Sequence, residues 1–95
     1  MIPTDLDAAR RIALLYESDP IADTVNAIIH RREGNFGKSI TWWRKVGFAA
    51  PEQVVAVYPD SDPVAFVRAA QRGDKSLLAL VEQAELAALR KVVCR

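Results

Sequence analysis

Apolar residues recur every three to four positions along most of this chain, which is the spacing of one face of an α-helix. Two such runs stand on either side of Gly34, and the second ends at Gly47. Glycine closes helices readily because it adopts a left-handed backbone at no steric cost. The pattern therefore predicts two helices joined by a tight turn, which must pack antiparallel. Their apolar positions are Ile21, Val25, Ile28 and Ile29 in the first and Phe36, Ile40, Trp43 and Val46 in the second.

Two adjacent tryptophans occupy the second helix of this predicted hairpin. Neighbouring residues of a helix lie about 100° apart, so the two indoles cannot point the same way. Trp43 falls on the apolar face with Ile40, and Trp42 widens that face on its Val46 side. We expect both large rings to hold the hairpin to its neighbours. Asn35 is the expected cap of the second helix, because its side chain can accept a backbone N–H.

Further helices are predicted before and after the hairpin. A weak capping box begins one over 5–17. Asp–Pro pairs begin helices over 20–33 and 63–72, since proline suits the first helical position. Asp74 is expected to cap the longest helix, 75–93, whose apolar residues extend around most of its circumference, as is typical of a central helix. Its expected core face comprises Leu77, Leu78, Val81, Ala88, Leu89 and Val92.

The segment 51–58 is ambiguous between a helix and an extended strand. Val54, Val55 and Val57 favour a strand, whereas Pro51 and Glu52 suit the first turn of a helix. A lone strand would lack a partner elsewhere in the chain, so we expect one or two helical turns. The predicted fold is all-α: a single compact bundle of five or six short helices built on the antiparallel hairpin, with residues 1–95 forming a single helical domain.

Composition and charge exclude fewer functions than folds. The 95 residues carry 13 basic and 12 acidic side chains, a net charge of +1, which gives no field to attract nucleic acid or an anionic membrane. No apolar run approaches the roughly 20 residues that span a bilayer. The single cysteine, Cys94, cannot form an internal disulfide, so we expect a reducing, cytoplasmic setting.

One polar strip of the 20–33 helix could hold a site. His30 and Glu33 lie three positions apart and are therefore neighbours on the helix surface. A histidine and a carboxylate at this spacing can ligate a metal or share a proton. Two ligands do not make a metal site, and the alternative is a solvated face or a histidine that hydrogen-bonds the neighbouring helix.

Glu85 is the third candidate, because it falls in the middle of the apolar face of the last helix. A buried carboxyl group without a partner would cost several kcal/mol, so we expect it to be paired or protonated. The hypothesis is a polar contact with the hairpin, through Arg32, His30 or an indole N–H. If His30 and Glu33 meet Glu85, the three residues could form a metal or acid–base site. The structural alternative is a buried pair that sets the register of the helices.

Basic residues also crowd the hairpin around the two tryptophans. Basic and aromatic side chains together can bind single-stranded nucleic acid by stacking and phosphate contacts. The helical spacing, however, places both rings on the buried face, and Lys38, Thr41 and Lys45 are too few readers for a recognition helix. The basic residues concerned are Arg31, Arg32, Lys38, Arg44 and Lys45.

The hairpin resembles a signature of small uncharacterised all-helical proteins of bacteria and fungi, which runs H-R-x-E-G-D, N-A and then Y-W-Y-R-R-x-G. It is also similar to a hairpin of the tetratricopeptide type, although no second copy follows at a fixed period. The resemblance implies an all-helical fold and singles out His30, Glu33 and Glu85, and it implies no activity. Asn35 replaces the Asp of the signature, which removes one carboxylate. The matching residues are His30, Arg31, Glu33, Gly34, Trp42, Arg44 and Gly47.

The leading hypothesis is a small helical interaction or scaffold module with no chemistry of its own and no cofactor. We expect a protein partner or a second copy of the chain, and neither nucleic acid nor a membrane. The first alternative is a metal- or acid–base-dependent enzyme that uses His30, Glu33 and Glu85, with His30 and Glu33 as the metal ligands. The second alternative is a nucleic-acid-binding helical protein.

Overall fold

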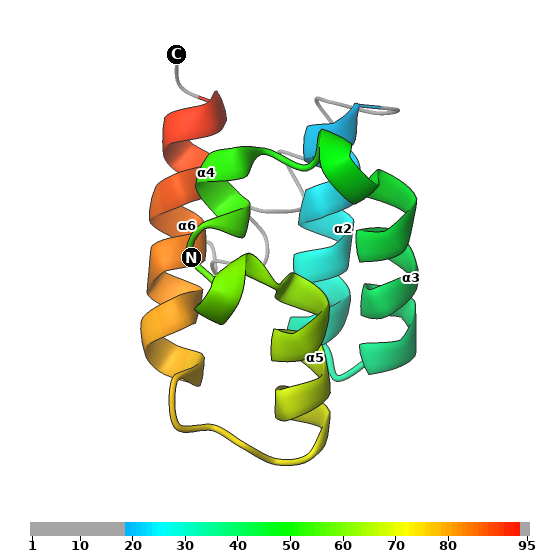
Figure 1. The fold of residues 1–95 in the computed structure, drawn as a ribbon, viewed down its shortest axis with the longest axis vertical. Coiled ribbons are helices and arrows are strands. Elements are labelled where there is room, and N and C mark those ends of the chain that lie inside the picture. Colours follow the sequence, from blue (N-terminus) through cyan, green and yellow to red (C-terminus); the bar gives the residue numbers. More distant parts are fainter. Residues whose placement is uncertain (1–18, 94–95) are drawn as a thin grey trace, which may run out of the picture. The chain divides into compact units, whose positions relative to one another are not determined.

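A computed structural model describes residues 19–93 of the chain and confirms the all-α prediction (Figure 1). Within that range it contains five α-helices, two short 3-10 helices and no strand. The helix expected over 5–17 lies outside the described residues. The chain divides into two compact units, Met1–Ala50 and Pro51–Arg95, and each is described by itself. A single domain over 1–95 stays a prediction.

The helices follow the order expected from the apolar pattern, with the numbering of Figure 1. The first unit holds α2 and α3, and the second holds α4, α5 and α6. A 3-10 turn precedes the end of the first unit, and another precedes α5. The bounds are α2 Pro20–Arg32, α3 Phe36–Val46, α4 Glu52–Val55, α5 Pro63–Gln71 and α6 Leu78–Val93, with 3-10 turns η1 Gly47–Ala49 and η2 Pro59–Ser61.

Aspartate followed by proline begins both α2 and α5, as predicted. The backbone N–H of Ile21 donates to Oδ1 of Asp19 over 2.8 Å. At α5 the Ala65 N–H donates to Oδ1 of Asp62 over 3.0 Å. Each carboxylate therefore satisfies one of the N–H groups that a helix start leaves without a partner, and the following proline has no N–H to satisfy.

The predicted turn between α2 and α3 is present. Gly34 has a φ of +83°, a left-handed conformation that favours glycine, and the Asn35 N–H donates to the His30 carbonyl over 2.7 Å. Gly47 ends α3 with a φ of +51°. The prediction for Asn35 is wrong in one respect: it occupies the cap position, but its side chain makes no capping hydrogen bond.

The hairpin is closed by an apolar interface between its two helices, which lie side by side and run in opposite directions (Figure 1). Trp43 on α3 is only 4% exposed, and Val25 and Ile28 on α2 are fully buried. The Ser39 hydroxyl donates to the Ala27 carbonyl over 2.6 Å and links the helices directly. Trp43 thus belongs to the core, as its spacing predicts, while Trp42 is half-buried.

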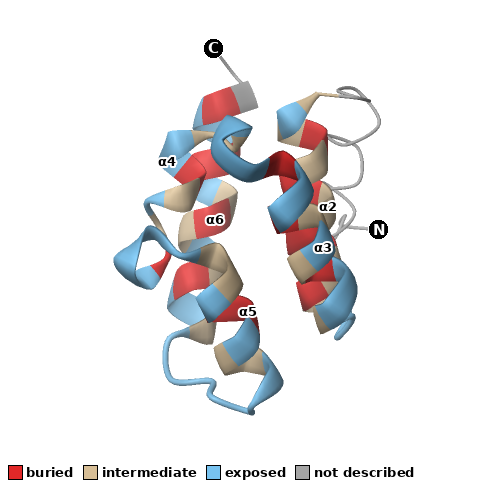
Figure 2. Cartoon of the chain, turned by 45° about the vertical axis from the view of Figure 1, so that its right-hand side comes forward, coloured by how far each residue is buried: buried red, intermediate tan, exposed pale blue. Residues whose placement is uncertain are grey.

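The helix with buried residues around most of its circumference is α2, and this differs from the prediction of a central C-terminal helix. Buried positions recur along α2 and along α6 (Figure 2). In α2 they include the polar residues Thr24 and Arg31 as well as the expected apolar ones. In α6 burial is confined to one side, and Leu80, Gln83 and Ala87 are exposed on the other. Apolar spacing alone overestimated how much of α6 is covered.

The ambiguous segment 51–58 is helical, as expected. α4 forms one turn in which Val54 is fully buried, and α4 packs against α6. Tyr58 follows the turn in an extended conformation and is also buried. The segment therefore places one residue of α4 and one residue that follows it in the core of the second unit, where packing outweighs the strand preference of the valines.

The start of α6 differs from the prediction. The helix begins at Leu78, three residues later than expected. The Asp74 carboxylate, the predicted cap, accepts hydrogen bonds from the backbone N–H and the hydroxyl of Ser76, at 3.1 and 2.7 Å. This local turn competes with helix for residues 74–77. It leaves Leu77 outside α6 and 45% exposed, although the sequence placed it in the core.

Candidate functional site

The sequence-predicted residues His30 and Glu33 lie at the end of α2. His30 is in the last turn and is half-buried, and Glu33 is the exposed residue at the C-terminal cap. The Nδ1 atom of His30 is buried and has no hydrogen-bond partner in the part of the chain described here. Among residues 19–93, no three His, Cys, Asp or Glu side chains gather where they could hold a metal ion. A metal or proton-sharing role of this pair stays a prediction.

Glu85 is buried as its place in the apolar pattern predicts. It is 0% exposed in α6, and the hydroxyl group of buried Tyr58 donates a hydrogen bond to its Oε2 atom. Tyr58 was not among the expected partners. It comes 27 residues earlier in the sequence, after the short α4 turn, and no local pattern marks it. The predicted contact of Glu85 with the hairpin joins the two units and stays a prediction.

The tyrosine that binds Glu85 also contacts α5. The rings of Tyr58 and Phe66 are tilted by 45° with their centroids 5.4 Å apart, within the range of favourable aromatic pairs. Glu85, Tyr58 and Phe66 therefore form a continuous chain of contacts from α6 to α5. The Phe66 ring thus packs against a tyrosine that is itself held by a buried hydrogen bond.

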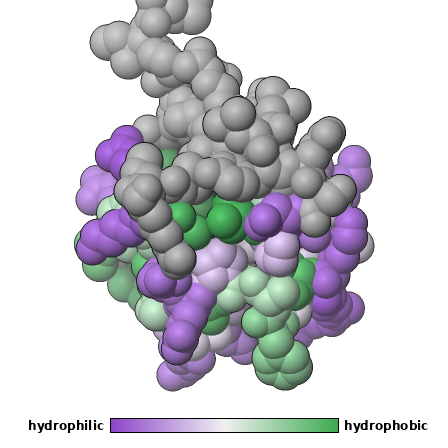
Figure 3. All heavy atoms as spheres, turned by 90° about the horizontal axis from the view of Figure 1, so that it is seen from above, coloured by the Kyte–Doolittle hydropathy of each residue, from purple (hydrophilic) through white to green (hydrophobic). Residues whose placement is uncertain are grey.

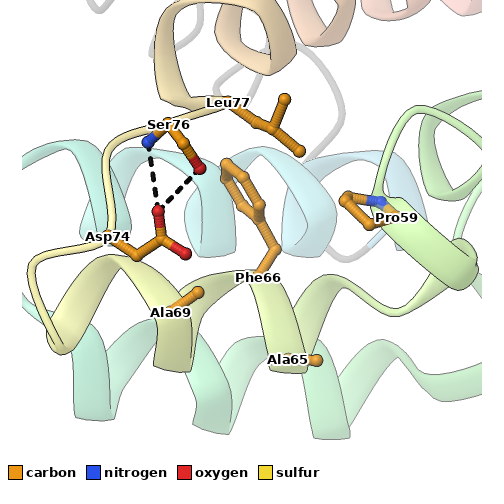
Figure 4. Close-up of a pocket in the computed structure, with 7 residues that line it drawn as sticks. All are labelled: Pro59, Ala65, Phe66, Ala69, Asp74, Ser76 and Leu77. Carbon is orange, nitrogen blue, oxygen red and sulfur yellow. Dashed lines mark hydrogen bonds between the residues drawn. The ribbon is translucent and has the colours of Figure 1, made fainter.

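Phe66 forms one wall of a pocket of about 260 Å³ in the second unit. In Figure 4 the Phe66 ring projects from α5 towards Leu77, with Pro59 at one end and Asp74 and Ser76 at the other. Five of the seven lining residues are apolar. The lining residues are Pro59, Ala65, Phe66, Ala69, Asp74, Ser76 and Leu77.

The polar end of the pocket is formed by the 74–77 turn, which precedes α6. The two hydrogen bonds from Ser76, first that of its hydroxyl and then that of its backbone, lower the pKa of Asp74 below its ordinary value of 3.8, with a smaller contribution from Arg72. A lowered pKa makes this carboxylate a weaker general base. Asp74 and Ser76 are thus better suited to binding and to stabilising the turn than to a reaction in which Asp74 activates Ser76 as a nucleophile.

Replacing Ser76 by alanine is expected to raise the pKa of Asp74 towards 3.8, because the largest cause of its lowering is the Ser76 hydroxyl. Since the folded-state pKa of Asp74 lies below the unfolded value, the interaction stabilises the fold above that value. The contribution is lost as the pH falls through the folded pKa. Titration of the Asp74 carboxyl by ¹³C NMR measures the shift, and an unchanged pKa would contradict it. In an Asp74→Asn background, Ser76→Ala should produce no pH-dependent change in stability.

Apolar side chains also reach the surface outside the pocket. Figure 3 shows hydrophobic residues at the surface among hydrophilic ones, in the view from above. Among residues 19–93, three large apolar residues are exposed: Phe48 fully, Leu80 at 67% and Leu77 at 45%. Leu77 lines the pocket, and Leu80 follows it by three residues, within the first turn of α6. Of these three residues, only Leu77 was predicted to lie in the core.

The basic and aromatic residues of the hairpin are poorly placed to bind bases. Trp43 and Arg31 are both buried in the hairpin. Lys45 stacks over the Trp42 ring with its Nζ 4.6 Å from the ring centroid, so this face of the half-buried indole already has a cation on it. Of the two tryptophans, only part of the Trp42 ring is therefore open to stacking on a base.

The comparisons add no assignment to these observations. In residues 19–93, no helix combines the length and the apolar character needed to cross a bilayer. No protein-family model, no curated protein and no solved structure matches the chain. The resemblance of the hairpin to a family of small helical proteins therefore stays a prediction, and the function rests on the geometry of the pocket and of the residues around it.

Proposed function

We propose that the protein is a small helical interaction module, which binds one large apolar side chain of a partner protein in the pocket between α5 and the 74–77 turn. The observation that carries the proposal is the pocket itself. It is lined mainly by apolar groups, with the partly exposed Leu77 among them. Pockets that accept an anchor residue of this kind are where the binding energy of protein interfaces concentrates.

The size of the pocket favours a side chain over a small-molecule substrate. Sites for drug-sized ligands have volumes of about 300–1,000 Å³, and this pocket has about 260 Å³. Burying a Leu, Met or Phe side chain contributes about 1.5–3 kcal/mol, enough to anchor a segment that makes further contacts along the rim. Leu80 extends the apolar surface beyond Leu77 and could supply such contacts.

The chemistry of the lining also favours binding over catalysis. Its two polar side chains, Asp74 and Ser76, are hydrogen-bonded to each other. None of the residues within 19–93 that line the pocket is a histidine, cysteine, lysine or arginine. On the opposite wall, Phe66 is supported by Tyr58, which is in turn held by Glu85. A preorganised wall of this kind reduces the entropy cost of binding.

The test is selection of random dodecapeptides displayed on phage against the immobilised full chain. We expect the selected peptides to share one large apolar residue. Those peptides should lose binding to Ala69→Phe, in which the added ring fills the pocket from α5. The matched control is Ala87→Phe, which adds the same ring at an exposed position of α6 outside the pocket. This control should bind the peptides as the native chain does.

Each outcome decides the proposal. Selective loss in Ala69→Phe supports it, provided that circular dichroism and the melting temperature show an intact fold. If Ala69→Phe does not fold, Leu77→Gln replaces it, since Leu77 is already partly exposed. Failure to enrich any peptide over background, or equal binding to the pocket variants and the native chain, would refute the proposal.

A further inference from the structure

The most exposed large apolar residue of the described chain is Phe48, in the η1 turn that follows α3. Isolated exposed apolar residues are common on protein surfaces, so exposure alone says little. Phe48 differs in how it is held. Gly47 before it has a φ of +51° and a ψ of −131°, a conformation that favours glycine. The aromatic ring is thus presented to solvent by a defined turn at the end of a packed helix.

The surroundings of Phe48 complement those of the pocket. Exposed Arg44 and Lys45 occupy the last turn of α3, which has no acidic residue along its length. Among the described residues that line the pocket, Asp74 is the one charged side chain, and an aspartate is ionised at neutral pH. An aromatic ring next to cations therefore matches an apolar pocket with a carboxylate at one end. The net charge of +1 opposes the approach of two copies very little.

We infer that the partner is a second copy of this chain, and that Phe48 of one molecule inserts between Phe66 and Leu77 of another. This inference rests on the proposed function of the pocket and names its occupant. The contact joins two different surfaces of the molecule, so two copies can exchange it reciprocally in a closed dimer or repeat it along a growing assembly. In either case association should increase as the concentration rises. A contact built on one side chain and one charge pair belongs to the small, weak class of interfaces.

Sedimentation velocity of the full chain tests the inference. We expect a mass of one chain, 10.5 kDa, at low concentration. The average mass should reach at least that of a dimer at concentrations well above a dissociation constant on the order of 100 μM. Phe48→Ala and Ala69→Phe should each remain monomeric. Mixed together, they should form a 1:1 dimer that does not grow, because one supplies only the pocket and the other only the ring. Ala87→Phe should associate as the native chain does.

The results distinguish this inference from the proposed function on which it rests. A native chain that is monomeric at 1 mM, a Phe48→Ala variant that still associates, or a mixture that forms no dimer would each overturn the second-copy assignment. Peptide selection could still succeed in those cases, and the proposed function would then stand with another partner. If no peptide is selected and association persists in Ala69→Phe, the proposed function and this inference both fail. Competition of a selected peptide with association would support both.

Discussion

Replacing Trp43 by alanine is expected to lower the free energy of unfolding by about 3–5 kcal/mol, the usual cost of removing a buried aromatic ring. Trp43 is 4% exposed and belongs to α3, which packs against α2. A domain of this size has about 5–10 kcal/mol of stability, so the loss approaches the whole. Urea denaturation followed by circular dichroism measures the effect.

The neighbouring tryptophan provides the matched control. Trp42 is half-buried, and the Lys45 ammonium group lies over its ring. Trp42→Ala forfeits part of an exposed ring and a cation–π contact of about 0.5–1 kcal/mol, so it should be clearly milder than Trp43→Ala. Equal destabilisation by the two substitutions would contradict the assignment of Trp43 to the hairpin core and of Trp42 to its edge.

Replacing Glu85 by alanine is expected to destabilise the protein by about 3 kcal/mol or more, because it combines two losses. The Tyr58 hydroxyl is left buried without the acceptor that Glu85 supplies, which costs about 1–3 kcal/mol. The missing side chain also leaves a cavity in a fully buried part of α6. Thermal and urea unfolding measure the sum. Gln83→Leu, at an exposed position of the same helix, should change stability by less than about 0.5 kcal/mol.

A double-mutant cycle separates the hydrogen bond from the cavity. Glu85→Leu and Tyr58→Phe each remove one partner of the buried contact, whereas the double variant removes both. Two residues in direct contact couple by about 0.5–3 kcal/mol, so the double variant should lose less stability than the two single variants together. Strict additivity would show that the Tyr58–Glu85 contact contributes nothing specific. Weaker peptide binding by Glu85→Leu would link the contact to the pocket wall at Phe66.

The hairpin was predictable because its determinants are local. Glycine at positions 34 and 47 ends each helix, and apolar residues at helical spacing select the faces that pack. The same reasoning placed Trp43 in the core and Asp62 at the start of α5, and both predictions are confirmed. The spacing of apolar residues predicts which face of a helix is buried, whichever element covers that face.

The pocket was not predictable, although two of its lining residues, Leu77 and Asp74, had been given places in the longest helix. Leu77 was assigned to the core face of that helix by its apolar spacing. An apolar side chain gives the same signal whether it fills a core or lines a pocket, because both are faces turned away from water. Leu77 lines the pocket because the hydrogen-bonded turn of Asp74 with Ser76 replaces the first turn of the expected helix.

By itself, the sequence determined where the helices lie, which glycines end them, and that Glu85 falls among apolar neighbours, because each of these depends on residues close together in the chain. Only the tertiary structure decided that Tyr58 is a partner of Glu85, that Phe66 is held against Tyr58, and that a pocket remains beside them. Those contacts join residues from separate helices, and their selection depends on how surfaces distant in the sequence fit together.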